Sequence, residues 1–233
     1  MNKSLLWDLP TRLFHWLLVL SLFAQYATAK WLDDAVQWHF YIGYFTLFLV
    51  LFRVMWGVVG TRYALFSHFV KGPKAVYIYL TQLFNKPALP TIGHNPLGGW
   101  FVLIMLALVA VQAVSGLYMT DDIFLDGPYR AFASDELVEV MTWLHHITFD
   151  LLLYVIALHI GAILFYGVYK KHRLVPAMLH GKQNSVYFNA QNTPIAHSKL
   201  GRALVVALLA AALVYFAIEI YPPTPEAGGY YYY

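Results

Sequence analysis

The stretch WLHHITFDLLLYVIALHIGAILFYGV, residues 143–168, decides the fold of this chain. Asp150 is its only formally charged side chain. The stretch is longer than the about 20 helical residues that cross a bilayer core, so it predicts a transmembrane helix. Two of its histidines, His145 and His159, lie fourteen positions apart. At about 100° per residue they share one face of the helix, about 21 Å apart along its axis.

Four further apolar stretches surround this one in the sequence. They cover residues 13–29, 38–59, 97–119 and 203–220. The whole chain of 233 residues is 60% hydrophobic and only 12% charged, whereas a soluble domain carries about 25% charged residues. This composition excludes a disordered or ordinary soluble protein. It predicts an all-α membrane protein with a four-helix transmembrane bundle and a fifth, C-terminal transmembrane helix.

The charges of the connecting segments predict the orientation. Residues 61–96 and 169–202 contain several lysines and arginines and no acidic residue, whereas residues 120–142 contain six acidic residues and one arginine. By the positive-inside rule, the N-terminus and the two basic segments are cytoplasmic. The acidic segment and the Pro- and Gly-rich tail, residues 222–233, then lie on the periplasmic side of a bacterial inner membrane. The formal net charge of +3 therefore reflects topology, and we expect a lipid bilayer and no nucleic acid as partner.

The chain combines ten histidines with no cysteine. The missing cysteines exclude disulfides, Cys-bound zinc, iron–sulfur clusters and covalently attached haem. An imidazole inside a membrane is costly unless it is paired or bound to something. The histidines within or at the ends of the apolar stretches are therefore the candidate functional residues.

Four histidines fit two depths in the membrane. His39 matches the depth of His145 near the outer side, and His15 matches that of His159 near the inner side. Neutral imidazoles on opposed helices at two depths are what two stacked six-coordinate haems require. The alternative is that these are core histidines satisfied by hydrogen bonds. His146 is the alternative to His145, but its separation of thirteen residues from His159 turns the two side chains apart.

Other residues are candidates for contacts to such a cofactor. Gly43, four residues after His39, would let a porphyrin edge approach the backbone, or would serve helix packing. Arg53, and more weakly Arg12, would pair with a haem propionate or extend to the membrane surface. His94 would contact a quinone oxygen or a propionate on the cytoplasmic side.

Several motifs resemble the bacterial cytochrome b561 and Ni,Fe-hydrogenase b-type cytochrome family. The resemblance covers roughly residues 7–183. It rests on the histidine pair at a separation of fourteen and on these motifs: Trp7-Asp8, Arg12-Leu13-Phe14-His15-Trp16, His39 with Gly43, Gly93-His94-Asn95-Pro96-Leu97-Gly98-Gly99-Trp100, Thr120-Asp121-Asp122 and Gly181-Lys182.

The resemblance implies a dihaem cytochrome b core with two non-covalent haem b groups. Carried over residue by residue, His15, His39, His145 and His159 fall on the four iron-ligand positions. The core covers residues 1–183, and residues 184–233 add a linker, the fifth helix and the tail. The implied function is electron transfer between the quinone pool and a periplasmic c-type cytochrome or dehydrogenase, with quinol oxidation or quinone reduction as the associated chemistry.

Two other functions fit the same residues. A haem-bearing membrane anchor would connect a periplasmic enzyme to the membrane without a quinone site of its own. A transporter or proton channel would use the histidines, together with Asp150, as a relay.

Overall fold

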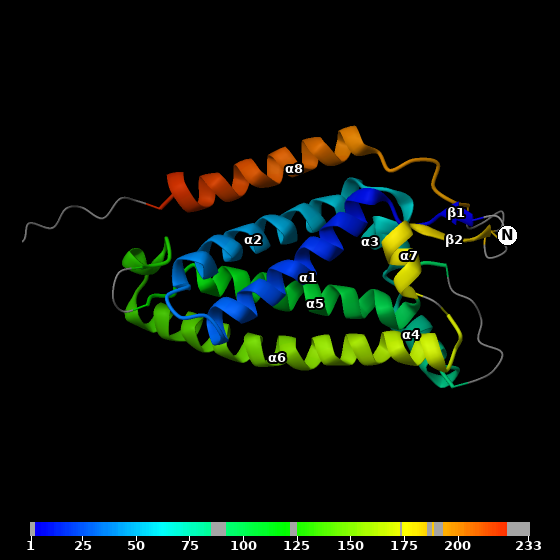
Figure 1. Ribbon diagram of the computed structural model, residues 1–233, viewed down its shortest axis with the longest axis horizontal. Coiled ribbons are helices and arrows are strands. Elements are labelled where there is room, and N and C mark those ends of the chain that lie inside the picture. The colour runs from blue at the N-terminus through cyan, green and yellow to red at the C-terminus, as the bar shows by residue number, and fades with distance from the viewer. Residues whose placement is uncertain are drawn as a thin grey trace, which may run out of the picture.

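The computed structural model is almost entirely helical, as the sequence predicts (Figure 1). It describes residues 3–84, 92–121, 125–172, 174–185, 188 and 193–222. The predicted periplasmic tail beyond residue 222 and Asp122 lie outside the described residues. The helices and strands are β1 (Lys3–Leu5), α1 (Leu9–Lys30), α2 (Val36–Val59), η1 (Arg62–Ala64), α3 (Phe66–Phe69), α4 (Pro73–Thr81), α5 (Pro96–Gly116), η2 (Arg130–Phe132), α6 (Asp135–Val168), α7 (Leu174–His180), β2 (Lys182–Asn184), α8 (Leu200–Tyr215) and the π-helical turn η4 (Phe216–Ile220).

Four long helices form a bundle, in which α1 packs against α2, α2 against α5, and α5 against α6. Buried Val50, Val109 and Leu152 bring α2, α5 and α6 together in one apolar cluster. Side-chain caps start three of these helices where the sequence offers them: Asp8 for α1, Asn95 for α5 and Ser134 for α6.

Helix α8 lies outside the bundle, along α2 (Figure 1). Small and β-branched side chains form its buried stripe, with Ala203, Val206 and Ala210 packed against Phe52 and Trp56 of α2. The Arg202 guanidinium donates to the Val59 carbonyl at the end of α2 (2.9 Å). The leucines on the opposite side of α8 are exposed, as expected for a face in contact with lipid.

The two ends of the bundle differ in structure. At one end lie α3, α4, α7 and the short sheet, and at the other lie the 31–35 connection and η2 (Figure 1). The sequence does not predict the sheet: β1 pairs antiparallel with β2, with Ser4 opposite Gln183. The described parts of the two segments that the sequence predicts to be cytoplasmic are thus at the same end as β1.

Buried Asp8 holds this end together. Its carboxylate accepts from the Thr11 backbone N–H (2.7 Å), from Trp56 Nε1 (3.2 Å) and from the Thr61 hydroxyl. It is only 1% exposed. Asp8 therefore caps α1 and at the same time links α1 to the C-terminal end of α2.

Four helices of the described part are long and apolar enough to cross a membrane: Val36–Val59, Pro96–Gly116, Asp135–Val168 and Leu200–Ile220. They correspond to four of the five predicted spans. Helix α1 has 22 residues and lies alongside α2, but it is not in this apolar set, because polar residues interrupt its sequence. The chain is therefore a multi-pass membrane protein.

Candidate functional site

Two pairs of histidines face each other across the bundle. The ring centres of His39 (α2) and His145 (α6) are 6.4 Å apart, and those of His15 (α1) and His159 (α6) are 6.5 Å apart. These are the pairs that the spacing in the sequence predicts. Because α6 contributes one ring to each pair, the pairs lie fourteen residues apart along this helix.

Hydrogen bonds indicate the ring tautomers of the pair His39–His145. His145 Nδ1 lies 3.1 Å from the Gln112 carbonyl, which can only accept, so this nitrogen carries the proton. Thr28 donates its hydroxyl to the Ala24 carbonyl (2.9 Å) and lies 3.0 Å from His39 Nδ1, from which it then accepts. In both rings the lone pair is then on Nε2, as in an imidazole that binds a metal ion, although in this structure Nε2 of His145 accepts from Gln112 Nε2.

Polar neighbours surround His145 within an otherwise apolar region. Ser115 Oγ lies 3.1 Å from its Nδ1, and Gln112 Nε2 lies 3.2 Å from its Nε2. The Thr148 hydroxyl donates to Gln112 Oε1. The sequence analysis missed these residues and Thr28; the signal that could have found them is a polar side chain at helical spacing inside an apolar stretch.

The pair His15–His159 is held by aromatic packing. His159 stacks on Phe101 with a ring-centre distance of 5.9 Å and an interplanar angle of 10°. The His15 ring lies edge-on to Trp16, and its Nδ1 is buried without a hydrogen-bond partner. A buried imidazole nitrogen with no partner is costly in hydrocarbon unless another group binds there.

The rings of each pair are spaced so that they could hold one metal ion, such as a haem iron, between them. A metal–imidazole nitrogen bond is about 2 Å long, which places the centres of two rings on opposite sides of one metal ion about 6 Å apart. The described residues contain no cluster of three or more His, Cys, Asp or Glu side chains around a common point. The arrangement is therefore two ligands at each of two places.

Buried cationic groups lie at the end of the bundle that carries α3, α4 and α7. Arg53 is only 3% exposed, its guanidinium lies 4.8 Å from the Phe66 ring centre, and its Nη1 has no hydrogen-bond partner. Arg12 donates from Nη1 to the Leu179 carbonyl (2.7 Å), but its Nε is buried and unpaired. Since a buried guanidinium requires acceptors, these two side chains fit a carboxylate such as a haem propionate.

His94 lies at the same end, between two aromatic rings. Its ring centre is 4.8 Å from that of Trp7 and 4.5 Å from that of Phe69. Burial, together with the nearby Arg53 guanidinium, lowers the pKa of His94 to about 3. The imidazole is therefore neutral at neutral pH, and its buried Nδ1 has no partner, so it can hydrogen-bond to a neutral or anionic ligand.

The remaining candidates take different positions. A Cβ on Gly43 would lie 3.2 Å from Gln25 Nε2, so this glycine permits close packing of α1 against α2. His146 and Asp150 are exposed on the side of α6 opposite Thr148 and Leu152, which are buried. The structure brings neither His146 nor Asp150 into the facing histidine pairs.

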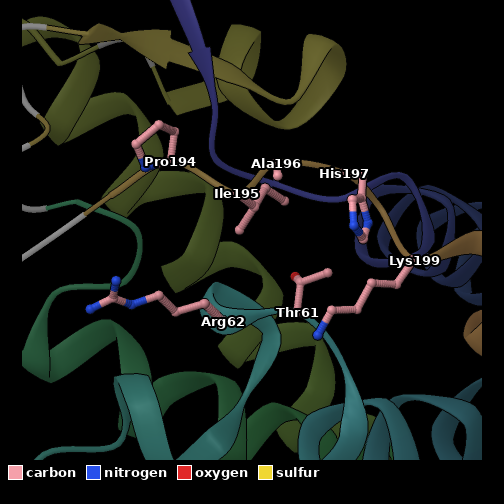
Figure 2. Close-up of a pocket in the computed structure, with 7 residues that line it drawn as sticks. All are labelled: Thr61, Arg62, Pro194, Ile195, Ala196, His197 and Lys199. Atoms are coloured by element: carbon pink, nitrogen blue, oxygen red, sulfur yellow. The ribbon is translucent and has the colours of Figure 1, made fainter.

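A hollow of about 210 Å³ opens at the same end of the bundle, between the start of the 61–72 segment and the 193–199 segment (Figure 2). Its lining consists of Thr61, Arg62, Pro194, Ile195, Ala196, His197 and Lys199. It is smaller than the about 300–1,000 Å³ of ligand pockets and contains none of the four paired histidines. It is thus separate from the candidate haem sites.

Comparison with known proteins assigns the family. A family model described as prokaryotic cytochrome b561 matches residues 6–181, well over half of the chain. No curated protein and no solved structure shows a significant match. The matched region contains all four paired histidines, His94, Arg12 and Arg53, and it confirms the family resemblance. The chain belongs to the prokaryotic cytochrome b561 family and is a membrane cytochrome that binds b-type haem and takes part in electron transfer.

Proposed function

We propose that this chain is a dihaem cytochrome b that transfers electrons across a bacterial inner membrane, between the quinone pool and a periplasmic c-type cytochrome or dehydrogenase. The observation that carries the proposal is the presence of two facing histidine pairs at two depths along α6. A single haem would need only one of them. Two pairs about 21 Å apart along the helix supply ligands near both sides of the membrane.

In this proposal His15 and His159 hold the inner haem, and His39 and His145 hold the outer one. When bound, haem iron supplies one-electron redox chemistry. Thr28 and the Gln112 carbonyl orient the two outer rings by accepting from their Nδ1–H groups. Such support fixes the ring and raises the basicity of the ligating nitrogen.

Buried charge and exclusion of water are further contributions of the chain. Arg53 and Arg12 would bind the propionates of the inner haem, since each has a buried nitrogen without a partner. Gly43 allows α1 to lie close to α2 at the level of the outer pair. The surrounding apolar side chains keep water away, which strengthens the effect of each fixed charge.

Quinone chemistry fits the inner end. The neutral His94 ring, with its unpaired Nδ1, is the candidate group for a hydrogen bond to a quinone oxygen or, alternatively, to a propionate. Residues 1–183 would then form the cytochrome core with four transmembrane helices, of which α1 is one, and α8 would be the fifth span. Residues 184–233 would add the linker, α8 and the periplasmic tail.

We infer the orientation from charge. The N-terminus, α4 and α7 would be cytoplasmic, since their connecting segments are basic. The segment 120–142, rich in acidic residues, would face the periplasm, where it would attract a partner with a cationic surface.

The test is a reduced-minus-oxidised absorption spectrum of the purified protein, combined with a count of haem per chain. We expect a b-type α band and two haems for each polypeptide. One haem per chain would refute the dihaem assignment. Reoxidation of the reduced protein by a soluble quinone analogue is expected as well, and its absence would favour a haem-bearing anchor without a quinone site.

A further inference from the structure

The hollow shown in Figure 2 brings basic side chains together from two distant segments of the chain. Arg62 lies on one side of it, and His197 and Lys199 lie on the other (Figure 2). Arg62 Nη1 donates to Thr193 Oγ1 (3.1 Å), which is 131 positions away. The segments 61–96 and 169–202, which supply the whole lining, contain no acidic residue. The hollow therefore attracts an anionic group.

Backbone hydrogen bonds fix the far wall of the hollow. The Ile195 N–H donates to the Leu5 carbonyl (3.0 Å), and the Leu9 N–H donates to Ser198 Oγ (3.1 Å). The 193–199 segment is thus tied to β1 and to the start of α1. A site that is already ordered before binding loses less conformational entropy when a ligand arrives.

Lys199 has an unusual backbone conformation. Its φ is 50°, in the left-handed region that glycine and asparagine tolerate best. Its ammonium group has three donors, but within the described residues its only hydrogen bond is a long one to the Gly60 carbonyl (3.4 Å). A residue held in a sparsely populated conformation is a reason to look for a functional role. Here the free donors of the ammonium point to an acceptor that the chain itself does not supply.

The hollow lies at the depth of the lipid headgroups. Lys199 directly precedes the apolar span Leu200–Ile220. Leu200 and Leu204, in the first turns of this span, are 56% and 62% exposed and therefore face acyl chains. Basic pockets between transmembrane helices on the cytoplasmic side bind the headgroups of anionic lipids.

We propose that this hollow binds the phosphate group of an anionic phospholipid, whose acyl chains lie along the exposed leucines of α8. Lys199 and Arg62 supply the positive charge, and the apolar part of the wall, Ile195 and Ala196, contacts the glycerol backbone. A volume of about 210 Å³ is small for a cofactor, but it admits one headgroup. This binding rests on the orientation proposed above and not on the haems.

The nearest acid does not oppose this binding. Asp8 lies behind Thr61, whose hydroxyl donates to it, and is only 1% exposed. Its charge interacts with that of buried Arg53. The negative charge of Asp8 is therefore engaged inside the bundle, and the basic side chains dominate the open side of the hollow.

The test is a titration of the purified full-length chain in a non-ionic detergent with phosphatidylglycerol, with bound lipid counted by native mass spectrometry. We expect one lipid to bind more tightly than any further one. Lys199→Asn removes the charge and suits the left-handed backbone, and it should raise the dissociation constant about tenfold, or about 1.4 kcal/mol. Lys74→Gln is the matched control, because Lys74 is exposed at the same end of the bundle. It should change the constant less than about twofold.

The melting temperature provides a second measurement. Phosphatidylglycerol should raise it for the wild type and for Lys74→Gln, because a ligand that binds the folded chain stabilises it. It should raise it less for Lys199→Asn.

Two outcomes would overturn the lipid site. Equal dissociation constants for Lys199→Asn and Lys74→Gln would mean that lipid is attracted by charge alone. Equal stabilisation by inorganic phosphate at the same concentration would assign the hollow to a soluble anion. Neither measurement depends on the number of haems, so failure of the lipid site and failure of the dihaem assignment are distinguishable.

Discussion

Replacing His159 by alanine should halve the haem content and leave the outer haem in place. The two histidine pairs share no ring, and their members on α6 are about 21 Å apart. The change therefore removes one ligand from the His15 pair, whose rings are 6.5 Å apart, and leaves the His39–His145 contact untouched. Loss of a group that merely supports a ligand lowers metal affinity about 10–100-fold, so loss of the ligand itself should prevent retention of that haem during purification.

The assay is haem extraction and counting, combined with a potentiometric titration of the visible bands. We expect the wild-type chain to hold two haems and His159→Ala to hold one, with one of the two redox components missing. His39→Ala should remove the other component, and the double variant should contain neither. His146→Ala is the matched control, because the His146 side chain is exposed on the side of α6 that points away from the bundle. This variant should retain both haems.

Two results would refute this reasoning. If His159→Ala or His39→Ala kept both haems, the ligand pairs would be assigned wrongly. If His146→Ala lost a haem while His145→Ala lost none, the ligand on α6 would be the neighbouring histidine, and the ring contact of 6.4 Å between His39 and His145 would not reflect ligation.

Three further variants test the supporting residues. Thr28→Val should lower the affinity for the outer haem about 10–100-fold in a haem-titration assay, because His39 Nδ1 loses its acceptor. Asp8→Ala should lower the free energy of unfolding by about 2–4 kcal/mol, because α1 loses its cap and the donors Trp56 Nε1 and Thr61 Oγ1 are left buried without an acceptor. The measurement is the melting temperature in detergent, which should fall. Arg53→Gln should lower the midpoint potential of the inner haem, because a buried positive charge that favours the reduced state is lost. Arg53→Lys keeps the positive charge and should keep most of the wild-type potential. Equal potentials in the wild type and both variants would contradict the role of Arg53.

The sequence predicts much of the fold because a membrane imposes simple rules. An apolar helix of about 20 residues crosses the bilayer core, and basic segments mark one side. Period and spacing alone place His145 and His159 on one face of α6. The sequence also predicts a span at residues 13–29, which lies within the 22-residue helix α1, although polar side chains make this helix less apolar than the other long helices.

The contacts of the site are harder to predict, because they depend on which helix faces are turned together. The hydrogen bonds between Thr28 and His39 and between Gln112 and His145 join residues 11 and 33 positions apart, and no local pattern indicates which residues form each pair. The short sheet between β1 and β2 is missed for the same reason, since it pairs segments about 180 residues apart.

The sequence by itself determined the membrane class, the apolar spans and four histidines at two depths, because these follow from local composition and from the 3.6-residue period of the helix. Only the tertiary structure decided which side of each helix faces the interior of the bundle. That choice depends on packing between segments that are distant in the sequence. This packing buries Arg53 against Phe66 and leaves Asp150 exposed on the side of α6 that points away from the bundle. Periodicity gives every helix its faces, but only the contacts with its neighbours decide which face meets a cofactor and which meets lipid.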